Sequence, residues 1–146
     1  MVVTEAWTLD VSVAIKWYLR DEELLEQADA VFSAFVDGSL GIATPDYFFD
    51  EASNILRTAV IRGRLTADQA RDDHSLLLNL GTVTVEPTAA RRSAALDIAL
   101  THNIAYYDAL YLQVSDEIGI PLLTADRPFF ERIVGAFPTT RFLGEL

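Results

Sequence analysis

Two aspartates of this chain follow short apolar segments and precede segments with helical periodicity. Asp10 comes directly after residues 7–9, and Asp126 repeats this arrangement after residues 121–124. In an open parallel sheet, the points at which strands pass into helices lie in the crevice at the carboxyl edge, where such sheets bind ligands. We therefore expect Asp10 and Asp126 to share one site, although they lie far apart in the sequence.

Asp108 is a third candidate for the same site. It begins a helix expected over residues 108–117, which is apolar nearly all round. A helix of that kind belongs in the interior, where a carboxylate at its start cannot easily reach water. Asp116 lies two turns later on this helix and is an undecided fifth acid.

Glu51 is a fourth candidate, on the basis of helical geometry. It falls on the border of the apolar stripe of a helix expected over residues 46–62, whereas Asp50 falls on the opposite, solvated side. We predict that Glu51 leans over the edge of the sheet, with Asn54 one turn later on its side.

Each of these acids also has a purely structural interpretation. An aspartate at the start of a helix accepts backbone N–H bonds and meets the positive end of the helix dipole. Asp10, Asp108 and Asp126 can each serve in this way as an N-cap. Glu51 can extend its carboxylate from the edge of the stripe into solvent.

Four carboxylates in one site cannot all stay ionised without a counter-charge, because like charges at short range raise one another's pKa. Oxygen ligands from aspartate and glutamate suit Mg²⁺ or Mn²⁺, and such sites activate water in phosphoryl chemistry. Ser12, Asn54 and Thr124 would then support the acidic ligands, the two hydroxyls by orienting them or a water. The hydroxyls can equally bond the local backbone at the starts of helices.

The length and composition favour one compact domain over residues 1–146, since 51% of the residues are hydrophobic. The absence of cysteine excludes disulfides and zinc held by thiolates. No apolar run approaches the ~18 residues that a membrane span needs, and the first six residues do not resemble a secretion signal. We expect a soluble cytoplasmic protein with no membrane partner.

The charge balance is acidic, with 22 Asp and Glu against 11 Lys and Arg and a net charge of −11. This balance argues against a protein that coats nucleic acid non-specifically, because such binding requires cations that neutralise phosphates. A basic partner or bound metal cations fit it better. Arg57, Arg62 and Arg64 lie close together and form either a local basic patch or a solvated helix end.

Helices and short strands alternate along the chain, which predicts an α/β fold with a mostly parallel sheet and helices on both faces. The expected strands cover residues 7–9, 40–44, 82–85 and 121–124, with a last edge strand at 141–143. The expected helices cover residues 13–18, 22–37, 46–62, 66–80, 88–103, 108–117 and 129–137.

Four segments of the chain together resemble the motif set of PIN-domain nucleases, and in particular the VapC-type toxins of toxin–antitoxin pairs. These segments are LDVSVA at residues 9–14, EASNIL at 51–56, YDALYL at 107–112 and LLTADR at 122–127. The resemblance implies a PIN-like three-layer α/β/α fold and an acidic site formed by Asp10, Glu51, Asp108 and Asp126. It also implies RNA cleavage that depends on Mg²⁺ or Mn²⁺, a homodimer, and a cognate antitoxin that blocks the site.

The residues leave two other functions open. One is a catalytically silent α/β module whose acids are helix caps and whose function lies in protein contacts. The other is a small-molecule phosphatase or phospho-receiver, which fits Asp10 but lacks an obvious lysine partner, since Lys16 is the single lysine. For the toxin interpretation, we expect an arginine of the antitoxin to enter the acidic site. The helices at residues 22–37 and 46–62 are expected to form a groove for that partner.

Overall fold

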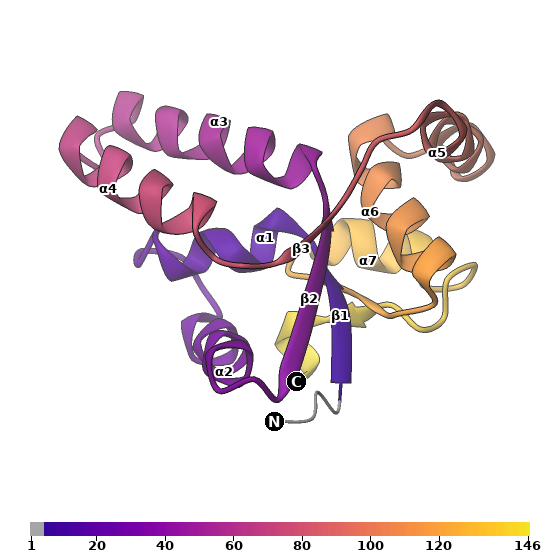
Figure 1. Cartoon of the computed structure of the whole chain (residues 1–146), viewed down its shortest axis with the longest axis horizontal. Helices are drawn as coiled ribbons and strands as arrows, with labels where there is room; N and C mark the ends of the chain where they lie inside the picture. Colours follow the sequence, from indigo (N-terminus) through magenta and orange to yellow (C-terminus); the bar gives the residue numbers. More distant parts are fainter. Residues whose placement is uncertain (1–4) are drawn as a thin grey trace.

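A five-stranded parallel sheet forms the centre of the computed structural model, which describes residues 5–146 (Figure 1). The order of the strands is β3-β2-β1-β4-β5, and all four pairings are parallel. The strands are β1 (Glu5–Leu9), β2 (Leu40–Pro45), β3 (Val83–Val85), β4 (Leu122–Thr124) and β5 (Arg141–Phe142). Residues 1–4, over which the sequence predicts no secretion signal, lie outside the described residues.

Helices cover both faces of this sheet and give the three-layer arrangement that the sequence predicts. Figure 1 shows α2 and α6 on opposite sides of the central strands, and both helices contact β2. The helices are α1 (Val11–Ala14), α2 (Leu25–Val36), α3 (Tyr47–Ile61), α4 (Ala67–Leu78), α5 (Ala89–His102), α6 (Tyr106–Ile118) and α7 (Arg127–Ile133). Two 3₁₀ turns, η1 (Ile15–Trp17) and η2 (Leu143–Glu145), complete the elements.

The topology changes direction between β1 and β4. The chain runs outward from β1 to β2 and β3, and then crosses the sheet to β4 and β5. The adjacent strands β1 and β4 pair with Leu9 opposite Leu123, and the Asp10 amide donates to the Leu123 carbonyl at 3.0 Å. Ligands bind at such a switch point in open α/β sheets. Asp10 and Asp126 therefore open onto the same edge, as predicted.

The central strands consist mainly of apolar residues because both of their faces are buried in the core. Leu9, Leu122 and Leu123 have no exposed surface, because a parallel sheet with helices on both faces leaves no side of a strand in water. Helix α6 is buried along its middle, from Tyr111 to Ser115, as its uniformly apolar sequence predicts. Among the described residues, no helix is both long and apolar enough to cross a membrane.

Three local predictions need correction. Helix α6 begins at Tyr106 with Ala105 as its N-cap residue, so Asp108 lies in the first turn and is not the cap. Helix α1 begins at once after Asp10 and becomes a 3₁₀ turn at residue 15, so Ser12 is already helical. The predicted groove between the second and third helices does not form, since α3 packs against α4 and the groove beside α2 lies between α2 and α4.

Candidate active site

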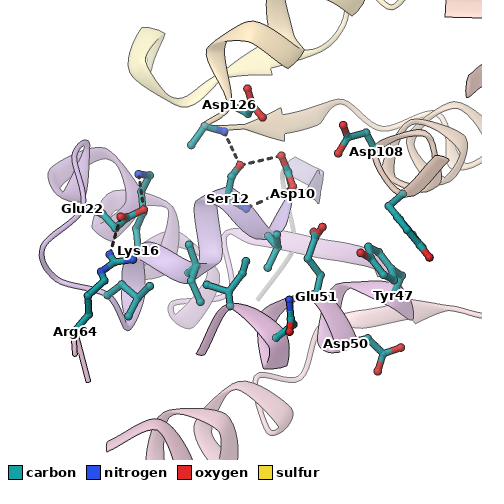
Figure 2. Close-up of a pocket in the computed structure, with 17 residues that line it drawn as sticks. Asp10, Ser12, Lys16, Glu22, Tyr47, Asp50, Glu51, Arg64, Asp108 and Asp126 are labelled. Carbon is teal, nitrogen blue, oxygen red and sulfur yellow. Dashed lines mark hydrogen bonds and ion pairs between the residues drawn. The ribbon is translucent and has the colours of Figure 1, made fainter. Parts of the chain in front are cut away.

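The carboxyl edge of the sheet opens into a cleft of about 690 Å³ that gathers the four predicted acids (Figure 2). Asp10 comes from the turn after β1 and Asp126 from the turn after β4. Glu51 lies on α3 and Asp108 on α6. Four segments that are far apart in the sequence thus contribute one carboxylate each. Two of the predicted supporting residues also line the cleft, namely Ser12 and Asn54.

Asp10 accepts hydrogen bonds from a hydroxyl at the end of β4 and from a hydroxyl in α1. The Thr124 hydroxyl donates to Asp10 Oδ2 at 2.7 Å, and the Ser12 hydroxyl donates to the same oxygen at 2.9 Å. The Ser12 hydroxyl in turn accepts from the Ala125 amide at 2.9 Å, and the Thr124 hydroxyl accepts from the Asp126 amide at 3.0 Å. These bonds fix the turn after β1 to the turn after β4. Asp10 also caps α1, so it serves as an N-cap and lines the cleft at the same time.

Three of the four cleft acids have pKa values above the ordinary values for their side chains. Burial raises the pKa of Asp10, with a further contribution from Asp126, although hydrogen bonds from Thr124 and Ser12 oppose the shift. Burial, then the charges of Asp10 and Asp126, raise the pKa of Asp108 to about 6. Burial also raises the pKa of Glu51 to about 7, assisted by Asp10 and Asp108. The acids therefore repel one another when ionised, as the sequence predicts.

Tyr111 is a site residue that the sequence analysis does not identify. Its side chain is fully buried, and its hydroxyl donates to Glu51 Oε1 at 2.8 Å. This bond fixes the Glu51 carboxylate between α3 and α6. A signal exists in the sequence, because Tyr111 follows Asp108 by one helical turn and a buried phenol requires a hydrogen-bond partner.

Other residues considered from the sequence lie outside the cleft. Asp116 is exposed on α6 and does not line the cleft, so it takes no part in the acidic group. His74 bonds the Ser53 hydroxyl at 2.8 Å, and the His102 ring packs edge-on against Phe137 at 5.1 Å. Neither histidine lines the cleft.

Comparison with known families decides the fold family. The model of the PIN domain matches residues 8–135. This chain belongs to the PIN domain family. No curated protein sequence matches the chain.

Two solved structures share the PIN fold of this chain. PAE2754 from Pyrobaculum aerophilum superposes with a TM-score of 0.66 at 20% identity, over 88% of this chain and 79% of the other. VapC20 of Mycobacterium tuberculosis, a toxin that cleaves the sarcin–ricin loop, superposes with a TM-score of 0.66 at 16% identity. That match covers 85% of this chain and 92% of the toxin.

The lining of this PIN-domain cleft includes further charged and aromatic side chains that the sequence does not predict there. Lys16, Glu22 and Arg64 line one end of the cleft, and Tyr47 and Tyr107 line another part. Lys16 carries a weak signal as the single lysine of the chain. The others come from helix ends and connections whose positions depend on tertiary packing.

The donors of this PIN cleft fit a hard divalent cation. Among residues 5–146, no group of three or more histidines and acids is already spaced to hold a metal ion. All four candidate donors are nevertheless carboxylates, which suit Mg²⁺ or Mn²⁺, and three of them have pKa values raised by burial and by one another. A divalent cation removes this repulsion, so the chemistry of the donor set and the electrostatics agree.

The raised pKa values predict a pH dependence of the metal-free protein. In the unfolded chain these carboxyls titrate near pH ~4, whereas in the folded protein Asp108 titrates at about 6 and Glu51 at about 7. Between these values the native state binds more protons than the unfolded state, so the free energy of unfolding falls as pH rises. Thermal melting in chelator should therefore show a decline from about pH 5 to about pH 8.

A variant isolates the contribution of the cleft from that of the net charge. Combining Glu51→Gln with Asp108→Asn removes two of the titrating groups and should flatten the decline in melting temperature. An unchanged slope in the double variant would show that the cleft acids do not cause it.

Proposed function

We propose that this chain is a metal-dependent endoribonuclease that hydrolyses RNA phosphodiester bonds, and that it acts as the toxin of a type II toxin–antitoxin pair. The observation that carries the nuclease proposal is the gathering of Asp10, Glu51, Asp108 and Asp126 in one cleft at the switch point of the sheet. Membership of the PIN domain family and the resemblance of the four motifs to PIN-domain nucleases support it.

The side chains have distinct parts in the proposed reaction. Asp10, Asp108 and Asp126 would hold one or two Mg²⁺ or Mn²⁺ ions, and Thr124 and Ser12 keep Asp10 oriented. A bound ion would supply activation of water and stabilisation of the charge that develops on the phosphodiester oxygens during hydrolysis. Glu51 positions a metal or the attacking water, with its carboxylate fixed by the Tyr111 hydroxyl.

The two alternative functions have less support. A silent module needs all the acids to be structural, yet Glu51 lies beyond the first turn of α3, where it cannot cap the helix, and Asp108 does not cap α6. A phospho-receiver or phosphatase needs a cation at Asp10. Lys16 does line the cleft, but Figure 2 shows it beside Glu22, with Nζ 3.7 Å from Glu22 Oε1, and away from Asp10.

The toxin part of the proposal implies protein partners. The motif resemblance is to VapC-type toxins, and the VapC20 toxin shares the fold. A groove between α2 and α4 exposes apolar side chains, including Phe32, Val36 and Leu76, that a segment of the antitoxin could cover. An antitoxin arginine in the acidic cleft would compete with metal. A homodimer is proposed from the resemblance alone.

A metal-titrated assay with purified protein tests the nuclease proposal. Cleavage of a labelled RNA should require Mg²⁺ or Mn²⁺, stop in chelator, and fail in the Asp10→Asn variant. Coexpression with the protein encoded beside this chain tests the toxin proposal. A neighbour that neither binds nor suppresses cleavage would defeat the toxin role and leave the nuclease role standing.

A further prediction concerns the hydroxyl that orients Asp10. Thr124→Val removes the donor to Asp10 and the acceptor of the Asp126 amide, so cleavage should fall about 10- to 100-fold, as for other groups that orient metal ligands. Thr8→Val on the neighbouring strand is the control, because the Thr8 hydroxyl is buried without a hydrogen-bond partner among the described residues. Cleavage rates of both variants test this prediction. An equal loss of cleavage in Thr124→Val and Thr8→Val would show that Thr124 only packs the core.

A further inference from the structure

The cleft has two regions that the acidic group does not explain. Figure 2 shows Lys16, Glu22 and Arg64 together on one side of Asp10 and Glu51. Tyr47 lies on the other side in the same view, and Tyr107 packs against it. The acids thus lie between a region with cations and a region with aromatic rings.

The cationic region contains both cations that line the cleft in the described chain, Lys16 and Arg64. One carboxylate bridges them. Arg64 Nη2 lies 2.8 Å from Glu22 Oε2, and Lys16 Nζ lies 3.7 Å from Glu22 Oε1, which is too long for a hydrogen bond. Arg64 also donates to the exposed carboxylate of Asp21, from Nε at 2.9 Å and from Nη2 at 2.7 Å. Lys16 is 7% exposed and faces the cleft, so its charge is directed to whatever occupies the cleft. The space between Lys16 and Arg64 is therefore suited to an oxyanion, and the Glu22 carboxylate fills it in this structure.

The aromatic region is a stacked pair. The rings of Tyr47 and Tyr107 have centroids 4.6 Å apart and planes inclined by 15°. Tyr107 is 54% exposed, and Tyr47 supports its ring from one side. An exposed ring on a rigid support beside a catalytic cleft is suited to stacking a base.

We propose that the cleft accepts a single-stranded segment of RNA, with one backbone phosphate held between Lys16 and Arg64 in place of Glu22 and one unpaired base stacked on Tyr107. This inference rests on the proposed nuclease function and specifies its substrate. The phosphate and the base bind on either side of the acids, so the strand between them crosses the proposed metal site.

A duplex does not satisfy both regions. Paired bases are stacked on their neighbours and cannot lie on Tyr107, whereas unpaired bases of loops and single strands can be splayed onto aromatic side chains. The phosphate contact is independent of sequence, so it positions the strand without selecting it. Glu22 acts as an internal competitor, because a phosphate must displace its carboxylate from Lys16 and Arg64.

Binding of a fluorescently labelled RNA, measured by anisotropy in Mg²⁺, tests the proposal. The protein carries Glu51→Gln to prevent cleavage during the measurement, and the probe is compared with the same strand annealed to its complement. The single strand should bind more tightly than the duplex. Arg64→Gln should weaken binding and make the slope of log K against log salt shallower by about 0.7, the value for one phosphate contact of a single strand.

Matched variants separate specific contacts from general charge effects. Arg20→Gln is the control for Arg64→Gln, because Arg20 also pairs with an aspartate, Asp29, but does not line the cleft. Glu22→Gln should tighten binding at least about 3-fold more than Asp29→Asn, which removes an equal charge. Tyr107→Leu should weaken binding by about 5-fold or more, whereas Tyr107→Phe keeps the ring and the affinity.

The outcomes distinguish this inference from the proposed function. If the wild-type protein cleaves RNA but Arg64→Gln matches Arg20→Gln and Tyr107→Leu matches Tyr107→Phe, the strand path is wrong and the nuclease function stands. A preference for the duplex would also overturn the inference. If the variants behave as expected but the wild type cleaves no RNA in any metal, the binding path stands and the nuclease proposal fails.

Discussion

Replacing Glu51 by glutamine is expected to reduce RNA cleavage by about 10²-fold or more, the loss expected when a group that positions a reactant is removed. Glu51 is the acid whose pKa, at about 7, lies closest to neutral pH. Glutamine keeps the size of the side chain and an oxygen that can accept from the Tyr111 hydroxyl, so the fold and the Tyr111 contact should persist. A loss of turnover with a melting temperature at or above that of the wild type would show that the charge of Glu51 itself is required.

Asp50→Asn is the matched control for this prediction. Asp50 is the neighbouring acid on α3 and also lines the outer part of the cleft, but its side chain is exposed, whereas Glu51 is half-buried. Cleavage by Asp50→Asn should therefore stay within a few-fold of the wild type. Equal losses from the two variants would mean that the cleft responds to total negative charge and that Glu51 has no special position.

The features of the site that follow simple periodic or topological rules are predictable from the sequence. Asp10 and Asp126 follow strands of one parallel sheet, and the carboxyl ends of such strands meet at one edge whatever the details of packing. Glu51 follows from the 3.6-residue period, since the apolar stripe of α3 fixes which neighbour faces the sheet. Both rules are local or depend on strand order alone, so no tertiary distance is needed.

The features that sequence reasoning misses depend on tertiary distances. Arg64 bonds Glu22 across 42 residues, and Tyr111 bonds Glu51 across 60. No period or motif connects such pairs. The start of α6 is missed for a different reason, because Ala105 has no side chain that can cap a helix and Asp108 is the first polar residue of the segment. Capping residues do mark the starts of α4 and α5, where Thr66 and Thr88 cap helices that the sequence predicts to begin at these positions.

Addition of Mg²⁺ or Mn²⁺ to the metal-free protein is expected to raise its melting temperature. In the native state, burial and the charges of neighbouring cleft carboxylates raise the pKa of Asp10, Glu51 and Asp108, and the unfolded chain lacks both effects. A cation that binds only the native state stabilises it by about 2.7 kcal/mol at 100 times its dissociation constant. For a chain of this size, that free energy corresponds to a shift of roughly 5–10 °C.

The Asp10→Asn variant should lose most of this shift without losing the fold. Both hydroxyls that bond Asp10 donate to the same oxygen, Oδ2, and an asparagine carbonyl in that position can still accept from Thr124 and Ser12. The substitution therefore removes a buried charge and keeps both hydroxyl bonds, and it loses only the long bond of 3.4 Å from the Ser12 amide to Oδ1. The metal-free variant should therefore melt at the same temperature as the metal-free wild type or higher. The melting temperatures of both proteins, with chelator and with each metal, measure the two effects separately. A wild type whose melting temperature does not respond to either metal would show that the four carboxylates do not form a metal site.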